Sequence, residues 1–341
     1  MILPLAMPHQ KLNFPFDMTV LAADIGATKS NLAYFKFSKN TFSIAKEKEY
    51  RSRDFSNIEQ LLNEFTNDVD QPRSVCLAVA GPVFNGKAYL TNLQWNIDSK
   101  KISSYFGLND VHVINDLEST AYGLGLLSRK ELQQIHKGSN RAIGNAAIIA
   151  PGTGLGEAGL YWDGKEFQPF ATEGGHSDFA PRNKFDYDLF TFLRRKFGHV
   201  SWERIISGPG IVNIYQVLRD KKNRKEPSWL KEKFKNNDVA ATISNHVNES
   251  LICKETIELF IRYMAYESAN LVLKLKATGG LFIGGGITPK LTSTFDNNVF
   301  YSSFCQSGRL NFLLEQVPVN IILNSRCALL GAAYFTQCNK Q

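Results

Sequence analysis

Two stretches of the chain share one pattern, an apolar run followed by a polar turn that is rich in small residues and then by a second apolar run. The first turn, residues 24–30, joins the runs 19–23 and 31–35, and the second turn, residues 151–157, follows the apolar run 145–150. This pattern predicts two strands joined by a tight turn. Because the two turns are about 130 residues apart, we expect two related lobes, each presenting a glycine turn to one phosphate chain between them.

The length and composition agree with two α/β lobes. A chain of 341 residues is too long for one ordinary core, and 43% hydrophobic with 21% charged residues is typical of a soluble globular protein. No apolar run approaches the ~20 residues that span a bilayer, and residues 1–17 lack the cationic start of a signal peptide. Five scattered cysteines without a Cys-x-x-Cys pair support neither a disulfide framework nor a zinc knuckle. We therefore expect a cytoplasmic protein without a membrane partner.

The net charge of +7 comes mostly from one segment. Residues 219–235 contain eight Lys or Arg against three Asp or Glu. A local excess of this kind, between helical patterns, favours a solvated loop and helix face over a nucleic-acid patch. A basic face near a polyphosphate site is the alternative.

The first turn has the chemistry of a phosphate site. Gly26 and Ala27 leave room for a phosphate at the backbone, Thr28 offers a hydroxyl and Lys29 a cation, and Asp24 could hold Mg²⁺ through water.

The second turn has three glycines in five residues, with Gly152, Thr153 and Gly154 placed to wrap an anion. The spacing 154-x-156-x-x-159 matches the dinucleotide fingerprint formally, but a strand rather than a helix follows it, so that interpretation is rejected.

A third glycine-rich turn follows a long amphipathic helix. The apolar periodicity predicts a helix over 256–276 that Gly279-Gly280 ends, then a strand over 281–283 and a helix from Pro289. Between the last two, Gly284 and Gly285 would let an adenine or ribose lie flat against the backbone.

Asp116 is the candidate catalytic centre. The apolar strand that begins at His112 ends in Asn115-Asp116, before a helix of small residues. A carboxylate at the carboxyl end of an α/β strand points into the crevice where such folds bind ligands, which suggests a general base. The alternative is that Asn115 or Asp116 only caps the helix.

Six motifs together resemble bacterial glucokinases of the hexokinase and actin-like ATPase superfamily. They are Asp24-Ile-Gly-Ala-Thr28, Ile114-Asn-Asp116, Gly152-Thr-Gly-Leu-Gly156, Glu173-Gly-Gly-His176, Ser207-Gly-Pro-Gly210 and Gly279-Gly-Leu-Phe-Ile-Gly-Gly-Gly286. Their order and spacing fit that family from about Val20 to Gly331.

The resemblance implies a two-lobed α/β actin-like ATPase (ribonuclease H-like) fold with the active site in the interlobe cleft. Residues 18–126 and 323–341 would form the small lobe, residues 127–322 the large lobe, and residues 1–17 an N-terminal extension. The implied activity is a glycolytic transferase reaction, the ATP-dependent phosphorylation of glucose to glucose 6-phosphate. The implied partners are ATP, Mg²⁺, glucose and a second copy of the chain in a homodimer, without nucleic acid.

The resemblance also implies roles for individual residues. Asp116 would be the base on the sugar 6-hydroxyl, and no side chain would bind metal directly, except Asp24 through water. The implied substrate-binding residues are Asn115, Asp116, Glu173, His176 and Glu203, and the implied nucleotide-binding residues are Asp24, Gly26, Ala27, Thr28, Gly152, Thr153, Gly154, Gly284 and Gly285.

Several alternatives stay open. Without the family, Glu203 would be a residue that suits a helix start and His176 a structural histidine. The sugar could be another hexose or an amino sugar, the donor could be ADP or polyphosphate, and the chain could be a non-catalytic sugar sensor. Ala27 and Lys29 stand where the family commonly has Gly and Asn.

Overall fold

The computed structural model describes residues 18–38, 41–139 and 143–338. The expected N-terminal extension, residues 1–17, lies outside them. The chain divides into two compact units, the first made of residues 1–131, 160–171 and 324–341 and the second of residues 132–159 and 172–323. Among the described residues, no helix combines the length and the apolar character that crossing a bilayer requires.

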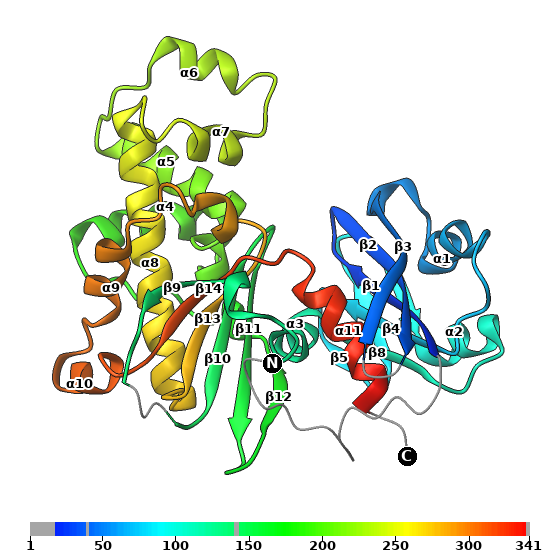
Figure 1. Ribbon diagram of the computed structural model, residues 1–341. Helices are drawn as coiled ribbons and strands as arrows, with labels where there is room; N and C mark the ends of the chain where they lie inside the picture. Colours follow the sequence, from blue (N-terminus) through cyan, green and yellow to red (C-terminus); the bar gives the residue numbers. More distant parts are fainter. Residues whose placement is uncertain (1–17, 39–40, 140–142, 339–341) are drawn as a thin grey trace. The chain divides into compact units, whose positions relative to one another are not determined.

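The first unit is built around a five-stranded sheet in the order β3-β2-β1-β4-β8 (Figure 1). Its elements are β1 (Met18–Ile25), β2 (Lys29–Ser38), β3 (Thr41–Arg51), η1 (Ser52–Asp54), α1 (Ile58–Thr66), β4 (Ser74–Val79), β5 (Val83–Phe84), β6 (Lys87–Leu90), β7 (Trp95–Asp98), α2 (Ser99–Phe106), β8 (Val111–Asn115), α3 (Asp116–Leu124), η2 (Arg129–Glu131) and α11 (Cys327–Cys338). The predicted hairpin at residues 19–35 is therefore confirmed as β1 and β2, which pair antiparallel.

Three parallel strands of this sheet end together. The register pairs Ile25 of β1 with Val79 of β4, and Val79 with Asn115 of β8. The turn after β1 and the polar residues after β8 therefore lie along the same edge of the sheet. This edge is at the carboxyl ends of the strands, where α/β folds bind their ligands.

Helix α11 packs closely on α3, and it also packs against β1 and β4. The Ser119 hydroxyl of α3 donates a hydrogen bond to the Ala328 carbonyl at 2.6 Å. A β-carbon on Gly331 would overlap the Ser119 carbonyl, so only glycine allows this separation of the two helices. The helix that begins with Asp116 is thus held by residues more than 200 positions later in the sequence.

The other large sheet has six strands in the order β12-β11-β10-β13-β14-β9, and β10, β13, β14 and β9 lie wholly in the second unit. The remaining elements are β9 (Leu132–His136), β10 (Ala146–Pro151), β11 (Leu155–Trp162), β12 (Phe167–Thr172), η3 (Gly174–His176), α4 (Lys184–Phe197), η4 (Trp202–Arg204), α5 (Gly208–Lys221), α6 (Ser228–Lys233), α7 (Val239–Asn245), α8 (Leu251–Leu275), β13 (Gly280–Ile283), η5 (Thr288–Leu291), α9 (Asn297–Phe304), η6 (Gly308–Leu310), α10 (Asn311–Leu314) and β14 (Val319–Ile322).

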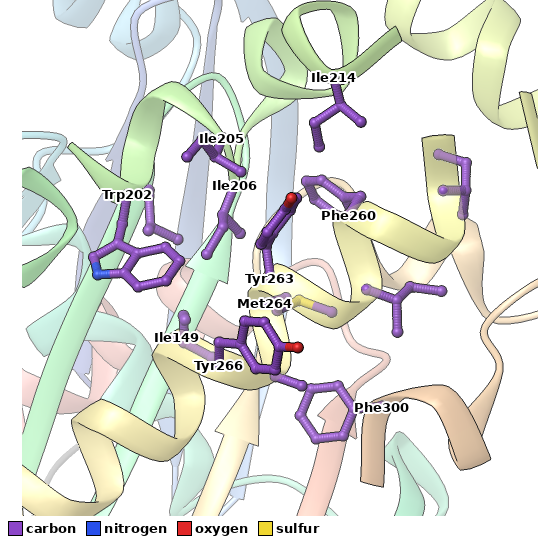
Figure 2. Packing of buried hydrophobic residues seen from close by; sticks show 14 of the residues in the cluster. Ile149, Trp202, Ile205, Ile206, Ile214, Phe260, Tyr263, Met264, Tyr266 and Phe300 are labelled. Atoms are coloured by element: carbon purple, nitrogen blue, oxygen red, sulfur yellow. The ribbon is translucent and has the colours of Figure 1, made fainter. Parts of the chain in front are cut away.

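The core of the second unit forms between α8 and the segment that carries η4. Figure 2 shows Ile205 and Ile206 pointing toward Tyr263 and Met264 of α8, and all four side chains are buried. Trp202 belongs to the same buried cluster. Because Trp202 and Ile205, on either side of residue 203 in the sequence, are anchored in this core, the backbone at residue 203 has a rigid support.

Two sequence predictions in this unit are corrected. Helix α8 begins at Leu251, before the predicted start at residue 256, and it ends at Leu275, next to the predicted end at residue 276. Its C-cap is Lys276 in a left-handed conformation (φ 49°), so Gly279-Gly280 is not what ends the helix. The predicted helix from Pro289 is only the short 3₁₀ turn η5.

Candidate functional site

The turn between β1 and β2 is held by hydroxyl groups. The Ser52 hydroxyl donates to the Gly26 carbonyl at 2.7 Å and lies 2.9 Å from the Ser30 hydroxyl, while the Ser52 amide donates to the Thr28 carbonyl at 3.2 Å. Ser30 and Ser52 are both fully buried. The turn therefore has a fixed shape while Thr28 stays exposed.

Three side chains of this turn now have defined surroundings. Burial raises the pKa of Asp24 to about 6, against a hydrogen bond with Asn31 that lowers it. Ala27 is not among the described residues with positive φ, so an L-side chain fits there without strain. Lys29 forms an exposed ion pair with Glu49 at 2.6 Å, which gives it a partner on β3.

Asn115 and Asp116 have different local roles. The Asn115 side chain is buried and is the N-cap of α3, accepting hydrogen bonds from the amides of Leu117 at 2.9 Å and Glu118 at 3.2 Å. Its own amide nitrogen donates to the Gly81 carbonyl at 3.2 Å. Asp116 is the first residue of the helix and is partly exposed, and one of its carboxylate oxygens also accepts from the Leu117 amide at 2.9 Å. The cap expected as an alternative is thus present, and Asn115 provides it.

In the second unit, the turn after β10 meets two other glycine-rich segments. The Gly208 amide at the start of α5 donates to the Gly152 carbonyl at 2.9 Å, and the Gly152 amide donates to the Gly154 carbonyl at 2.8 Å. After β13, the Gly284 amide donates to the Ile149 carbonyl at 2.8 Å. The second and third glycine turns of the sequence, together with the first turn of α5, are therefore neighbours.

Gly285 is required by packing. It has φ of 79°, and a β-carbon there would overlap the Pro151 carbonyl. The glycine therefore has a structural reason in addition to the predicted nucleotide contact, which stays a prediction.

Glu203 is joined to the glycine turn. Its carboxylate accepts a hydrogen bond from the Leu155 amide at 3.1 Å, and it fills the space that a β-carbon on Gly154 would need. Glu203 lies in the 3₁₀ turn η4 rather than in an α-helix, and the observed contact is with a distant turn rather than with its own first turn. The Glu203 carboxylate therefore links the glycine turn 151–157 to the segment 202–204.

The Glu173–His176 loop lies beside these residues. It forms the 3₁₀ turn η3, closed by the His176 amide donating to the Glu173 carbonyl at 3.0 Å, and both side chains are exposed. The Trp202 amide donates to the Ser177 carbonyl at 3.0 Å, which fastens η3 to η4. The three predicted sugar contacts of this unit, Glu173, His176 and Glu203, are thus brought together by the fold. Glu173 and His176 are exposed and Glu203 is partly exposed, and carboxylates and an imidazole can bind hydroxyl groups.

Sequence reasoning missed one acidic residue close to this loop. Glu157 of β11 is 1% exposed, and its Oε1 has no hydrogen-bond partner in the part of the chain that the structure describes. Burial raises its pKa to about 8, with a further contribution from the charge of Glu267. A glutamate in a strand-like run carries no sequence signal of this kind, because only the packing reveals that its side chain is buried.

Four of the eight basic side chains in the segment 219–235, those of Arg219, Lys222, Arg224 and Lys235, form ion pairs with acidic residues. Arg219 contacts Asp220 and Glu226, Lys222 contacts Asp188 at 2.9 Å, and Arg224 contacts Glu255 at 2.6 Å. Such pairing lowers the positive charge that the segment offers to phosphates, and the solvated-face interpretation stays a prediction. In the described ranges, no group of three or more His, Cys, Asp or Glu side chains is arranged to hold a metal ion.

Similarity to known proteins identifies the family of this chain. The glucokinase family model matches residues 21–339. The chain belongs to the glucokinase family. It is 37% identical to the glucokinase of Trichormus variabilis, over 92% of this chain and 97% of that protein.

Solved structures show the same fold. A glucokinase from an Antarctic psychrotroph superimposes with a TM-score of 0.77 at 32% identity, covering 94% of this chain and 99% of that chain. A ROK family glucokinase from Streptomyces griseus, in complex with glucose and AMPPNP, gives a TM-score of 0.61 at 18% identity, covering 92% and 98%. The expected actin-like ATPase fold of this family is therefore confirmed.

Proposed function

We propose that this chain transfers the terminal phosphoryl group of ATP to the 6-hydroxyl of glucose, with Asp116 as the general base. The observation that carries the activity is membership of the glucokinase family over residues 21–339. The choice of Asp116 is supported by its position, because it is partly exposed at a strand end while its neighbour Asn115 caps the helix.

Phosphoryl transfer needs positioned groups more than covalent chemistry. Asp116 accepts the proton of the attacking hydroxyl, and the buried Asn115 fixes the start of α3 and with it the position of that carboxylate. Glu173, His176 and Glu203 bind other sugar hydroxyls, since carboxylates accept and an imidazole can donate. Thr153, Gly154 and the amides of their turn bind phosphate oxygens.

ATP is the proposed donor, and the Streptomyces griseus neighbour, in complex with AMPPNP, supports it. The small residues Gly26, Ala27 and Thr28 would face the phosphates in the first unit, and Gly284 and Gly285 the nucleoside in the second. Mg²⁺ would enter with ATP, and when bound it neutralises charge on the β- and γ-phosphates. Asp24 fits that ion as an oxygen donor acting through water, and it is ionised above its pKa of about 6.

The cellular setting is proposed on the same basis. We propose that the protein acts in the cytoplasm, at the first step of glycolysis, and that it works as a homodimer without nucleic acid. Sedimentation of the purified protein checks the dimer, and the paired charges of residues 219–235 support the absence of nucleic acid.

The test compares two aspartates that precede or begin a helix. Asp116→Asn removes the base and nearly preserves volume, so we expect kcat to fall at least ~10²-fold, with glucose and ATP affinities within a few-fold of wild type. Asp98→Asn is the matched control, because Asp98 is the true N-cap of α2 and accepts from the Lys100 amide at 2.9 Å. This control should lose a little stability and keep its kcat.

The measurement is ADP release against a panel of hexoses with ATP, ADP and polyphosphate as donors. A folded Asp116→Asn protein that keeps more than about a tenth of its kcat, as the cap variant does, would show that another group takes the proton. A panel in which another sugar or donor is preferred to glucose and ATP would reassign the substrate instead.

A further inference from the structure

Glu157 lies under the loop that carries two of the proposed sugar contacts. Its side chain is buried in β11, and its Oε2 occupies the space that a β-carbon on Gly174 would need. Its Oε1 is without a hydrogen-bond partner among the residues described. A buried carboxyl group with an unpaired oxygen is unfavourable when charged, so its contact with Gly174 depends on its protonation.

The charged groups around this carboxyl do not neutralise it. Glu267 of α8 is fully buried, and burial raises the pKa of Glu267 as well, against hydrogen bonds from Asn270 at 2.7 Å and Lys274 at 3.4 Å and the charge of Arg182. For Glu157, the Lys274 charge lowers the pKa by less than burial and Glu267 raise it, so the group titrates near pH 8. Glu157 is therefore mostly uncharged at neutral pH.

A second link joins Glu157 to the same loop. The Thr172 hydroxyl donates to the Glu157 carbonyl at 3.0 Å and accepts from the Gly174 amide at 3.2 Å. The loop itself is closed by the amides of His176 and Ser177, which donate to the carbonyls of Glu173 and Gly174. Backbone and side chain of one strand residue thus both support the start of the loop.

We propose that Glu157 is a positioning residue for the hexose, which in its uncharged form supports the loop 173–176 and on losing its proton to solvent displaces Gly174 and weakens sugar binding. The displacement follows because a new buried charge needs water or a donor, and the loop with its exposed side chains is what can move to admit one. The proposal deepens the proposed function and rests on it, since Glu173 and His176 bind sugar only under that function.

The kinetic test measures KM for glucose and kcat between pH 6.5 and 9.5 in wild type and Glu157→Gln. Glutamine has the shape of the neutral acid and cannot ionise, so wild-type KM should rise about fivefold from pH 7 to pH 9, while KM of the variant changes less than about twofold. The kcat values should follow the same pH course in both proteins. Glu166→Gln, in the β11–β12 turn, is the control and should behave as wild type.

A ratio of wild-type to Glu157→Gln glucose KM that stays constant across this pH range would overturn the proposal. A large rise in KM of Glu157→Gln already at pH 7 would also overturn it, because the charged form would then be the working one.

Two readouts do not depend on activity. The amides of His176 and Ser177 should lose protection from exchange in wild type at pH 9 and keep it in Glu157→Gln at the same pH.

The free energy of unfolding should also depend on pH. A carboxyl whose pKa is raised from 4.5 to about 8 in the folded state binds more protons when folded, so wild type loses stability as the pH rises between these two values. Glu157→Gln lacks that loss, and equal pH slopes in the two proteins would count against the proposal. If no sugar is phosphorylated, the proposed function is wrong. The amide-exchange and stability measurements still test whether Glu157 supports the loop 173–176.

If Glu157→Gln does not fold, Gly174→Ala provides the test. The added β-carbon overlaps Glu157 Oε2, so glucose KM should rise at every pH, and shortening the acid in the double variant Glu157→Asp/Gly174→Ala should restore part of it. An unchanged glucose KM in Gly174→Ala would show that the contact does not position the loop.

Discussion

The two strand-turn-strand motifs have the same plan but are held by partners at different distances along the chain. The turn after β1 is held by Ser52, which lies 26 residues after Gly26 in the sequence. Ser52 directly follows β3, the strand that pairs with β2. The turn after β10 is held by Glu203, 48 residues from Leu155, and by the more distant amides of Gly208 and Ile287, which donate to the carbonyls of Gly152 and Pro151. The first turn is thus supported mainly within one meander, with one further bond from the Ala80 amide to the Ile25 carbonyl, whereas the second depends on three separate segments.

This difference predicts which substrates are affected when each turn is altered. The Glu203 carboxylate holds the second turn and is also a proposed sugar contact, so a change in that turn should weaken the binding of both glucose and ATP. The contacts described for the first turn come from Ser52, Ser30, the Ala80 amide and the adjoining strands, none of which is a proposed sugar contact, so damage there should affect ATP alone.

The largest effect should come from Gly154→Ala. The added β-carbon overlaps the Glu203 carboxylate, which must move, and a misplacement of about 1 Å in a reactive complex can reduce the rate ~10²-fold. We expect kcat/KM for glucose to fall by about that factor. The matched change in the first turn is Gly26→Ala, where the β-carbon would lie 2.9 Å from the Lys29 carbonyl. It should raise the ATP KM and leave the glucose KM unchanged, and equal glucose losses in both variants would break the comparison.

Glu203→Gln should have a smaller effect. Glutamine can still accept from the Leu155 amide, so the turn survives, but a charge-assisted bond to a sugar hydroxyl is weakened, and such bonds are worth about 1.5–3 kcal/mol. Glucose KM should rise roughly tenfold while ATP KM barely moves. Steady-state kinetics with each substrate varied checks this, and an unaltered glucose KM would leave Glu203 as a support for the turn alone.

Ser52→Ala tests the support of the first turn. The variant loses the bond to Gly26 and leaves the buried Ser30 hydroxyl without its observed partner, so we expect a loss of about 1 kcal/mol in unfolding free energy. ATP KM should rise a few-fold with no change for glucose. Ser43→Ala, at an exposed position of β3, is the control for urea titrations and should match wild type.

Lys29→Gln should have the smallest effect. Exposed ion pairs contribute at most about 1 kcal/mol, and the partner of Lys29 is Glu49, so ATP KM should stay within about twofold of wild type. Lys36→Gln, on the same strand, is the control. A tenfold rise of ATP KM confined to Lys29→Gln would show that Lys29 leaves Glu49 to bind phosphate.

Local signals were sufficient for several strands and insufficient for the contacts that hold them in place. Apolar runs followed by turn residues predicted β1, β2 and β8, and the polar residues at the end of β8 predicted where Asp116 would lie. Lys276 ends α8 in a left-handed conformation that its residue type does not favour, so the sequence indicated the later glycines instead.

The site itself divides in the same way. Glycine spacing predicted the three turns, but nothing local could show that Glu203 reaches Leu155, or that Glu157 is buried under Gly174, because these contacts join residues brought together only by the packing of the second unit.

The dependence of the first unit on α11 has a consequence for biosynthesis. Translation delivers residues 327–338 only after residues 132–323, yet these residues cover β1 and β4 and hold the helix that starts with Asp116. The strands of the first unit therefore emerge from the ribosome before the second unit, and the sheet is covered only after the whole of residues 132–323 has been made. A nascent chain must keep the apolar face of that sheet from aggregating throughout this interval, which makes the early strands the natural place for a chaperone to bind.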